Sequence, residues 1–185
     1  LYEIVSTLLD YQFTATVSHY VVGDTAKHFS TVYAITNGVA LFVQLFLTAN
    51  IMTRFGLRAA LLVMPCMILG ASGLFVLLPI LWVGSALNTA DNAFNYSINQ
   101  SARESLYTPL TRDEKYKAKA FIDMFLYRTA KVVAVGVTLA VGACCTSGEF
   151  TAVRWLSVVT IGLLFIWIAV ARYAGGRFHE MTDRA

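Results

Sequence analysis

Polar side chains able to hydrogen-bond a solute recur through one apolar stretch of this sequence. At 100° per residue they fall within roughly 120° of arc on a helix, opposite an apolar side. They are Ser85, Asn88, Asp91, Asn92, Asn95, Asn99 and Arg103. An Asp at the middle of a membrane helix costs about 2.5–3.5 kcal/mol, so helix packing alone does not explain this run. We therefore expect a water-filled cavity or a polar substrate path beside it.

A second polar face lies further along the sequence and carries opposite charges. It consists of Tyr116, Asp123, Tyr127, Lys131 and Thr138, with Arg128 off to one side. Asp123 and Lys131 are two helical turns apart, about 12 Å along the axis, which is too far for a direct ion pair. Each therefore needs another partner, and both an internal ion-pair lock and contact with a substrate stay open.

Two earlier apolar stretches carry similar polar stripes. The first holds Glu3, Thr7, Asp10, Thr14 and Ser18, and the second holds Tyr33, Asn37, Gln44 and Thr48. Ser and Thr in membrane helices often only bond neighbouring helices, and this interpretation covers most of those found here. Asn37 and Gln44 are the candidates for substrate contact on the second stretch.

The elements that must position these side chains are membrane helices. Of 185 residues, 57% are hydrophobic and 14% are charged, against roughly 25% charged in a soluble domain. This composition excludes a soluble domain, and the abundance of large apolar residues excludes disorder. Three cysteines, two of them adjacent, exclude a disulfide scaffold. A net charge of only +3 argues against a nucleic-acid partner.

Hydropathy divides the chain into six apolar stretches, each close to the roughly 20 residues that a helix needs to cross a bilayer. The expected spans are residues 2–22, 31–53, 57–78, 80–102, 119–143 and 152–174, with a loop at 103–118. Long apolar runs without a ten-residue alternation predict helices rather than a barrel. The sequence thus predicts an all-α membrane protein with one membrane domain and six transmembrane helices.

Lys and Arg are distributed unequally between the two ends of these helices. Ten lie on the side of the 103–118 loop and the C-terminus, whereas only Lys27 and Arg154 lie on the other side. The positive-inside rule therefore places the loop and both termini in the cytoplasm. The expected location is a bacterial inner membrane.

The third and sixth stretches differ from the others because they lack a polar stripe. The order striped, striped, plain therefore occurs twice and indicates a three-plus-three repeat, with the third helix of each triplet peripheral. This pattern matches the six-helix half of the major facilitator architecture, which contains nested inverted repeats.

Two connecting segments carry motifs. Residues 53–58 read Thr-Arg-Phe-Gly-Leu-Arg and look like the Gly/Arg-rich turn of major facilitator halves, in which Gly permits a tight reversal. Residues 104–123 read E-x-x-Y-x-P-L-x-x-x-x-K-x-K-A-K-A-x-I-D, and Lys131 follows eight residues later. This string resembles the ATP/ADP translocases of plastids and intracellular bacteria, and more closely their free-living bacterial relatives. Residues 10–13, Asp-Tyr-Gln-Phe, are similar to the start of that family's second half.

The resemblance implies a nucleotide exchanger, or a relative of one, of which only the C-terminal half is present. The positions that match the family's charged signature are Glu104, Lys115, Lys117, Lys119, Asp123 and Lys131. Lys131, together with Arg103 or Arg128, would neutralise phosphate inside the membrane. Arg128 departs from the plastid type, which tends to have an uncharged residue there.

The same resemblance assigns roles to the amides. Asn92, Asn95 and Asn99 would bond the sugar or the base of a nucleotide. Asn37, Gln44, Asp91 and Asp123 complete the predicted substrate-binding set.

Motifs for catalysis and for metals are missing from the sequence. There is neither a G-x-x-x-x-G-K-S/T loop nor a G-x-G-x-x-G loop. His19, His28 and His179 lack metal-ligand spacing, and no nucleophile–base pair can be proposed. We therefore expect a transporter rather than an enzyme, with neither metal nor cofactor.

The chain opens directly in an apolar stretch without an initiator Met, so we expect a fragment, a processed chain or the ordered part of a longer protein. One interpretation is half of a carrier that works by alternating access. The alternative is a carrier-derived structural subunit of a larger membrane complex that does not transport. In both cases lipid covers part of the surface. A missing N-terminal half, a second copy or other membrane subunits would cover the polar stripes.

Overall fold

The computed structural model describes residues 1–185 except 22, 109–110, 145–148 and 183–185. All regular structure in the described residues is helical, which confirms the predicted all-α class. The α-helices are α1 (Tyr2–Tyr20), α2 (Thr25–Phe42), α3 (Ala49–Leu77), α4 (Leu81–Phe94), α5 (Gln100–Leu106), α6 (Arg112–Phe121), α7 (Tyr127–Cys144) and α8 (Glu149–Thr182). Three π-helical segments each join two successive α-helices into a continuous run. Segment η1 (Val43–Thr48) joins α2 to α3, η2 (Asn95–Asn99) joins α4 to α5, and η3 (Ile122–Leu126) joins α6 to α7.

The six apolar stretches predicted from hydropathy are helical over nearly all of their described residues. The first was expected to end at Val22, which lies outside those residues. Three helical runs are both long enough and apolar enough to cross a membrane, namely Thr25–Leu77, Arg112–Cys144 and Thr151–Phe178. Length and hydropathy therefore make this an integral membrane protein.

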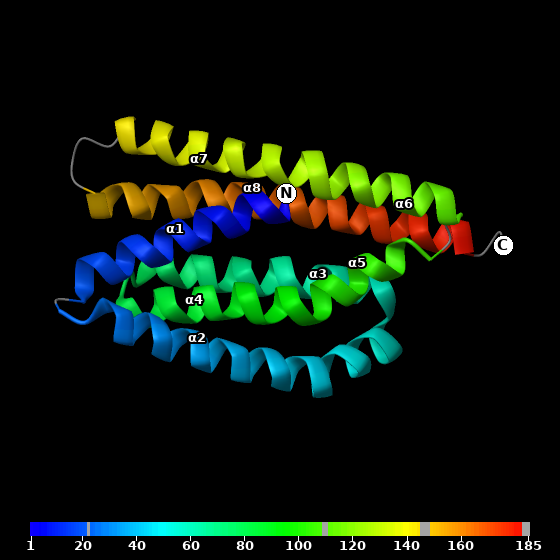
Figure 1. The fold of residues 1–185 in the computed structure, drawn as a ribbon, viewed down its shortest axis with the longest axis horizontal. Coiled ribbons are helices and arrows are strands. Elements are labelled where there is room, and N and C mark those ends of the chain that lie inside the picture. Colours follow the sequence, from blue (N-terminus) through cyan, green and yellow to red (C-terminus); the bar gives the residue numbers. More distant parts are fainter. Residues whose placement is uncertain (22, 109–110, 145–148, 183–185) are drawn as a thin grey trace.

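The longest of these runs contains a sharp break at Gly56. Its backbone has φ +74° and ψ 177°, a combination that is essentially restricted to glycine. The chain reverses its direction close to this residue, so that α2 and the main part of α3 run in opposite senses (Figure 1). The Gly/Arg-rich turn predicted for residues 53–58 is therefore where the reversal occurs.

Replacement of Gly56 by alanine is expected to destabilise the fold by about 1–3 kcal/mol, because a Cβ makes this conformation strained. Gly70→Ala is the matched control. Gly70 lies inside α3, and an added Cβ would meet nothing within 4 Å, so alanine there should stabilise the helix by about 0.5–1 kcal/mol. Thermal unfolding of the detergent-solubilised variants measures both effects. Equal midpoints for the two variants would contradict the role given to Gly56.

The largest apolar cluster lies where α3 packs along α8. Its members from these two helices are Ala60, Leu61, Met64, Ile68, Phe75, Val153, Leu164, Trp167 and Ala171. A hydrogen bond from Arg58 Nε to the carbonyl oxygen of Gly175, at 2.9 Å, joins the same two helices near their ends.

This packing corrects the expectation that the third and sixth stretches are peripheral. Within this chain they bury one face against each other, because two apolar helices without polar stripes can pack closely. Among the long helices, α2 and α7 bury the fewest side chains, and they lie at opposite edges of the bundle in Figure 1. Helix α1 packs against α4, α7 and α8 and so connects the two sides.

Candidate functional site

Polar side chains of α1 and α4 meet in the interior of the bundle. Ser6 donates a hydrogen bond of 2.6 Å to Oδ2 of Asp91, which is completely buried. About one turn away on each helix, after Ser6 on α1 and before Asp91 on α4, Nδ2 of Asn88 donates to Oδ1 of Asp10 at 3.1 Å. The Asp91 side of the predicted polar face therefore contacts another helix of the same chain.

The predicted amides form most of their hydrogen bonds within their own helical run. Asn92 donates to the carbonyl oxygen of Asn88 at 3.0 Å and to its Oδ1 at 3.3 Å. Asn99 donates to Oδ1 of Asn95 at 3.0 Å. Asn99 is buried, whereas Asn92 and Asn95 are half-buried. These contacts orient the amides and leave part of Asn92 and Asn95 accessible.

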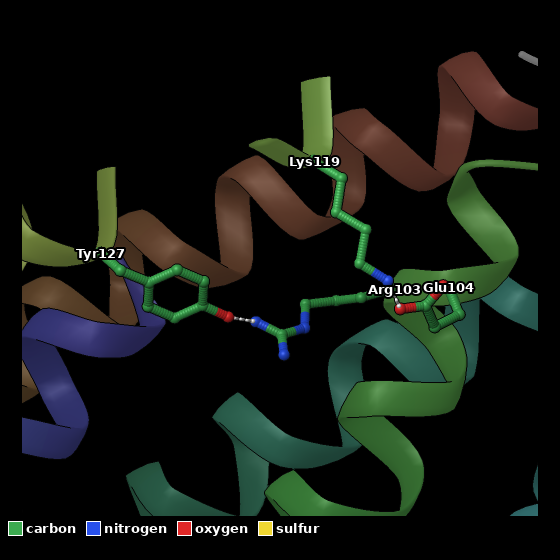
Figure 2. A network of polar contacts seen from close by, with 4 residues as sticks. All are labelled: Arg103, Glu104, Lys119 and Tyr127. Carbon is green, nitrogen blue, oxygen red and sulfur yellow. Dashed lines mark hydrogen bonds and ion pairs between the residues drawn. The ribbon is translucent and has the colours of Figure 1, made fainter. Parts of the chain in front are cut away.

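Arg103 is the centre of a second polar group at the end of α5. Its Nη1 donates a hydrogen bond of 2.7 Å to the hydroxyl of Tyr127 (Figure 2). Its guanidinium also lies 5.7 Å from the centre of the Tyr2 ring. Two adjoining pockets, of about 340 Å³ and about 250 Å³, share Arg103 and Tyr127 in their walls. A guanidinium between two pockets is placed to meet an anionic group in either of them.

Lys119 and Glu104 border the larger pocket. Lys119 Nζ lies 2.6 Å from Glu104 Oε1 (Figure 2). The Lys119 ammonium holds the pKa of the Glu104 carboxyl below its ordinary value. Both side chains are nearly half exposed, so water screens the pair and its contribution to stability is small. Because the pKa is lowered, this contribution is present above the unfolded pKa of about 4.3 and is lost as the pH falls through the folded value.

The structure also places the charges of η3 and α7. Asp123 lines the larger pocket with Lys119. Lys131 is exposed and lies near enough to Glu3 and Asp10 of α1 to attract both electrostatically. Opposite charges for Lys131 therefore come from α1 rather than from Asp123.

Several predicted residues do not join these groups. Asn37 and Gln44 are exposed on α2 and η1, and Arg128 is exposed on α7. Of the loop signature, Lys117 is exposed and Lys115 is half-buried, and neither borders the pockets around Arg103. Pro109 and Leu110 of the same motif lie outside the described residues.

Other residues of these groups were absent from the predicted set. Ser6, Asp10, Asn88 and Tyr127 contribute side chains to the contacts described above. A signal for three of them was present, because Asp10, Asn88 and Tyr127 belong to the polar stripes. Ser6 lies outside its stripe, and only the packing of α1 on α4 reveals its contact with Asp91.

The π-helical segments coincide with predicted site residues. Gln44 lies in η1, Asn95 and Asn99 lie in η2, and Asp123 lies in η3. Segments η1 and η2 also contact each other. A π turn carries one additional residue relative to an α turn, and such turns are frequent at functional sites. The assignment of these residues to a substrate site stays a prediction.

Apolar helices that can span a membrane, with charged side chains between them, define an integral membrane protein. The chain belongs to the TLC ATP/ADP transporter family, whose pattern matches residues 69–178. This match covers more than half of the chain and includes α4, the connecting loop and α7. The family resemblance predicted from residues 104–123 is confirmed.

Carriers from bacteria and plants are similar to the chain. ADP,ATP carrier protein 1 of Chlamydia muridarum is 27% identical over 74% of this chain and 29% of the carrier. ADP,ATP carrier protein 2, chloroplastic, of Arabidopsis thaliana is 23% identical over 82% of this chain and 28% of the carrier. ADP,ATP carrier protein 5 of Rickettsia typhi is 24% identical over 86% of this chain and 36% of the carrier.

The chain therefore spans about 30% of the length of the first two of these relatives. No solved structure shows a significant match to it.

Proposed function

We propose that this chain is the C-terminal half of a nucleotide exchange carrier of the ATP/ADP type. The observation that carries the proposal is the family match over residues 69–178. Two features add support: the basic group around Arg103 and the similarity to carriers named for ADP and ATP. Family membership favours a carrier over a structural subunit that does not transport.

In this proposal the chain is a single membrane domain that crosses the bilayer six times, as half of a major facilitator-type protein with a three-plus-three repeat. The six helical stretches and the reversal at Gly56 support this arrangement. Transport would proceed by alternating access, in which the bundle rocks against a second half around a central site. Nucleotide binding would shift the populations of the inward- and outward-facing states.

The proposed phosphate-binding cations are Arg103 and Lys131, with Arg128 as the third candidate. In the structure Arg103 donates to Tyr127, and Lys131 attracts Glu3 and Asp10. A bound phosphate would compete with these partners, so each cation would have a protein partner when the site is empty. An Arg is suited to bidentate contact with phosphate, whereas a Lys acts as a point charge.

The remaining candidates would recognise the uncharged parts of the nucleotide. Asn92 and Asn95 keep accessible surface and would bond the sugar or base, with Asn99 supporting Asn95. Asn37 and Gln44 on the exposed helix α2 and segment η1 would contact substrate or the second half across the cavity. Asp91 and Asp123 would tune the charge of the site.

The carrier function is tested with the complete carrier that contains this chain. Liposomes loaded with ADP are expected to take up labelled ATP, whereas liposomes without internal nucleotide should take up at least tenfold less. The difference arises because an exchanger must return with a nucleotide bound. Uptake that does not depend on internal nucleotide would contradict exchange, and an absence of nucleotide uptake would contradict the carrier function itself.

The proposed orientation places the 103–118 loop and both termini in the cytoplasm of a bacterial inner membrane. Cysteines introduced at Lys27 and Arg112, both exposed, are expected to react with an impermeant reagent from opposite sides of sealed vesicles. The reason is the excess of Lys and Arg on the cytoplasmic side, ten against two, which sets the orientation during insertion. Labelling of both positions from the same side would contradict this orientation.

A further inference from the structure

The Asp91 carboxyl lies in the interior of the bundle, and no ion pair to it is found in the part of the chain that the structure describes. Its relative exposure is 0%, and Oδ2 accepts the hydrogen bond from Ser6 at 2.6 Å. The other oxygen, Oδ1, has no hydrogen-bond partner among the residues that the structure describes. A buried carboxylate normally accepts several hydrogen bonds or pairs with a cation. Asp91 therefore lacks the usual means of keeping a negative charge in this position.

The charges on α1 make the ionised form of Asp91 still less favourable. Glu3 and Asp10 lie close enough to repel a negative charge on Asp91. Two cations act on these α1 carboxylates: Lys131 on both Glu3 and Asp10, and Arg103 on Glu3. Glu3 and Asp10 thus already balance the charges of Lys131 and Arg103, and Asp91 is a third carboxyl for which neither cation remains.

The other helices that pack on α4 do not supply a cation to Asp91. From α2, the titratable side chain that contacts α4 is His28, which lies against Ser85 at 3.3 Å, six residues before Asp91. The part of α3 that follows Arg58 has no acidic or basic residue up to Leu77.

We propose that Asp91 is a proton-binding site, and that the protein binds and releases this proton as α1 moves relative to α4 during transport. The inference rests on the carrier function proposed above and adds a second ligand to it. While Asp91 is buried, it holds the proton as a neutral carboxylic acid, the form favoured without a cation. When α1 withdraws Ser6 and water reaches Asp91, the O–H bond breaks, the proton passes to water and a carboxylate remains. Reburial takes a proton from water again.

Infrared spectroscopy of the complete carrier in lipid tests the site without requiring transport. The carbonyl stretch of a protonated carboxylic acid is expected at neutral pH, and Asp91→Asn should abolish its Asp91 component. Asp113→Asn, the same change on the exposed surface of α6, should leave the band intact. The proposal is overturned if Asp91→Asn removes no protonated-acid absorbance.

Ser6→Ala provides a second variant in case Asp91→Asn does not fold. It removes the hydroxyl that donates to Oδ2 and keeps the carboxyl, so the acid band should move to higher frequency. A band unaffected by Ser6→Ala would contradict its assignment to Asp91.

A transport measurement separates the proton site from the carrier function. Liposomes with an entrapped pH indicator should show a pH change during nucleotide exchange, at least tenfold smaller per nucleotide in Asp91→Asn. Exchange with the same proton movement in both proteins overturns the proposal and leaves the carrier function intact. An Asp91-dependent infrared band in a protein that moves no nucleotide supports the proton site and overturns the carrier function.

Discussion

Exchange of nucleotide by the complete carrier is expected to fall roughly tenfold to a hundredfold when Lys131 is replaced by alanine. A charge-assisted hydrogen bond contributes about 1.5–3 kcal/mol, and each 1.4 kcal/mol corresponds to a factor of ten. The loss should be large because the phosphate would meet Lys131 inside the membrane, where water cannot replace the missing cation. Uptake of labelled ATP into ADP-loaded liposomes measures the effect.

Two further variants make this result specific. Lys131→Arg keeps the charge and should retain part of the exchange, although guanidinium and ammonium groups differ in shape and hydration. Lys27→Ala removes an exposed cation from the opposite end of the bundle and should exchange nucleotide at the wild-type rate. Unchanged exchange in Lys131→Ala would remove this residue from the binding site.

The second large effect concerns residues 1–185 expressed alone, which are expected to transport no nucleotide. Helices α2 and α7 bury few of their own side chains, and the chain spans about 30% of relatives such as the Chlamydia muridarum carrier. Alternating access requires a second bundle against which the first can rock. The surface of α2 and α7 would face that bundle.

The measurement combines mass and transport. The isolated chain is purified in mild detergent, its mass is determined at low concentration, and it is reconstituted into liposomes. Covalent connection to the remainder of the carrier should restore exchange. A stable monomer that exchanges nucleotide would refute the half-carrier proposal, whereas stable association with an unrelated complex, without exchange, would favour the structural subunit.

Hydropathy was sufficient to predict the helices, because long apolar runs have few alternatives in a bilayer. The pairing of side chains was not predictable in the same way. Arg103 and Tyr127 are 24 residues apart, and no local pattern indicates that their side chains meet. Likewise, the face containing Asn92 and Asn99 was predicted, but their bonds to Asn88 and Asn95 depend on backbone geometry.

The positions of α3 and α8 illustrate a second limit of the sequence. An apolar helix without a polar stripe fits equally well against lipid or against another apolar helix, since both surroundings are hydrocarbon. Hydropathy therefore could not distinguish a peripheral helix from a member of the α3–α8 cluster. Polar stripes were more informative, because α1 and α4 do place Asp10 and Asn88 in contact.

The π segment Ile122–Leu126 sets the direction in which each side chain of the following helix, α7, points around the helix axis. If this wide turn closed into ordinary α turns without loss of a residue, the extra residue would rotate the rest of α7 by about 100°. Lys131 would then point away from Glu3 and Asp10, although neither its identity nor the hydropathy of the helix had changed. Deletion of one residue within the π segment, with closure to an α turn, would thus leave the direction of Lys131 nearly unaltered, whereas deletion of one residue between Leu126 and Lys131 would rotate this cation by about 100°.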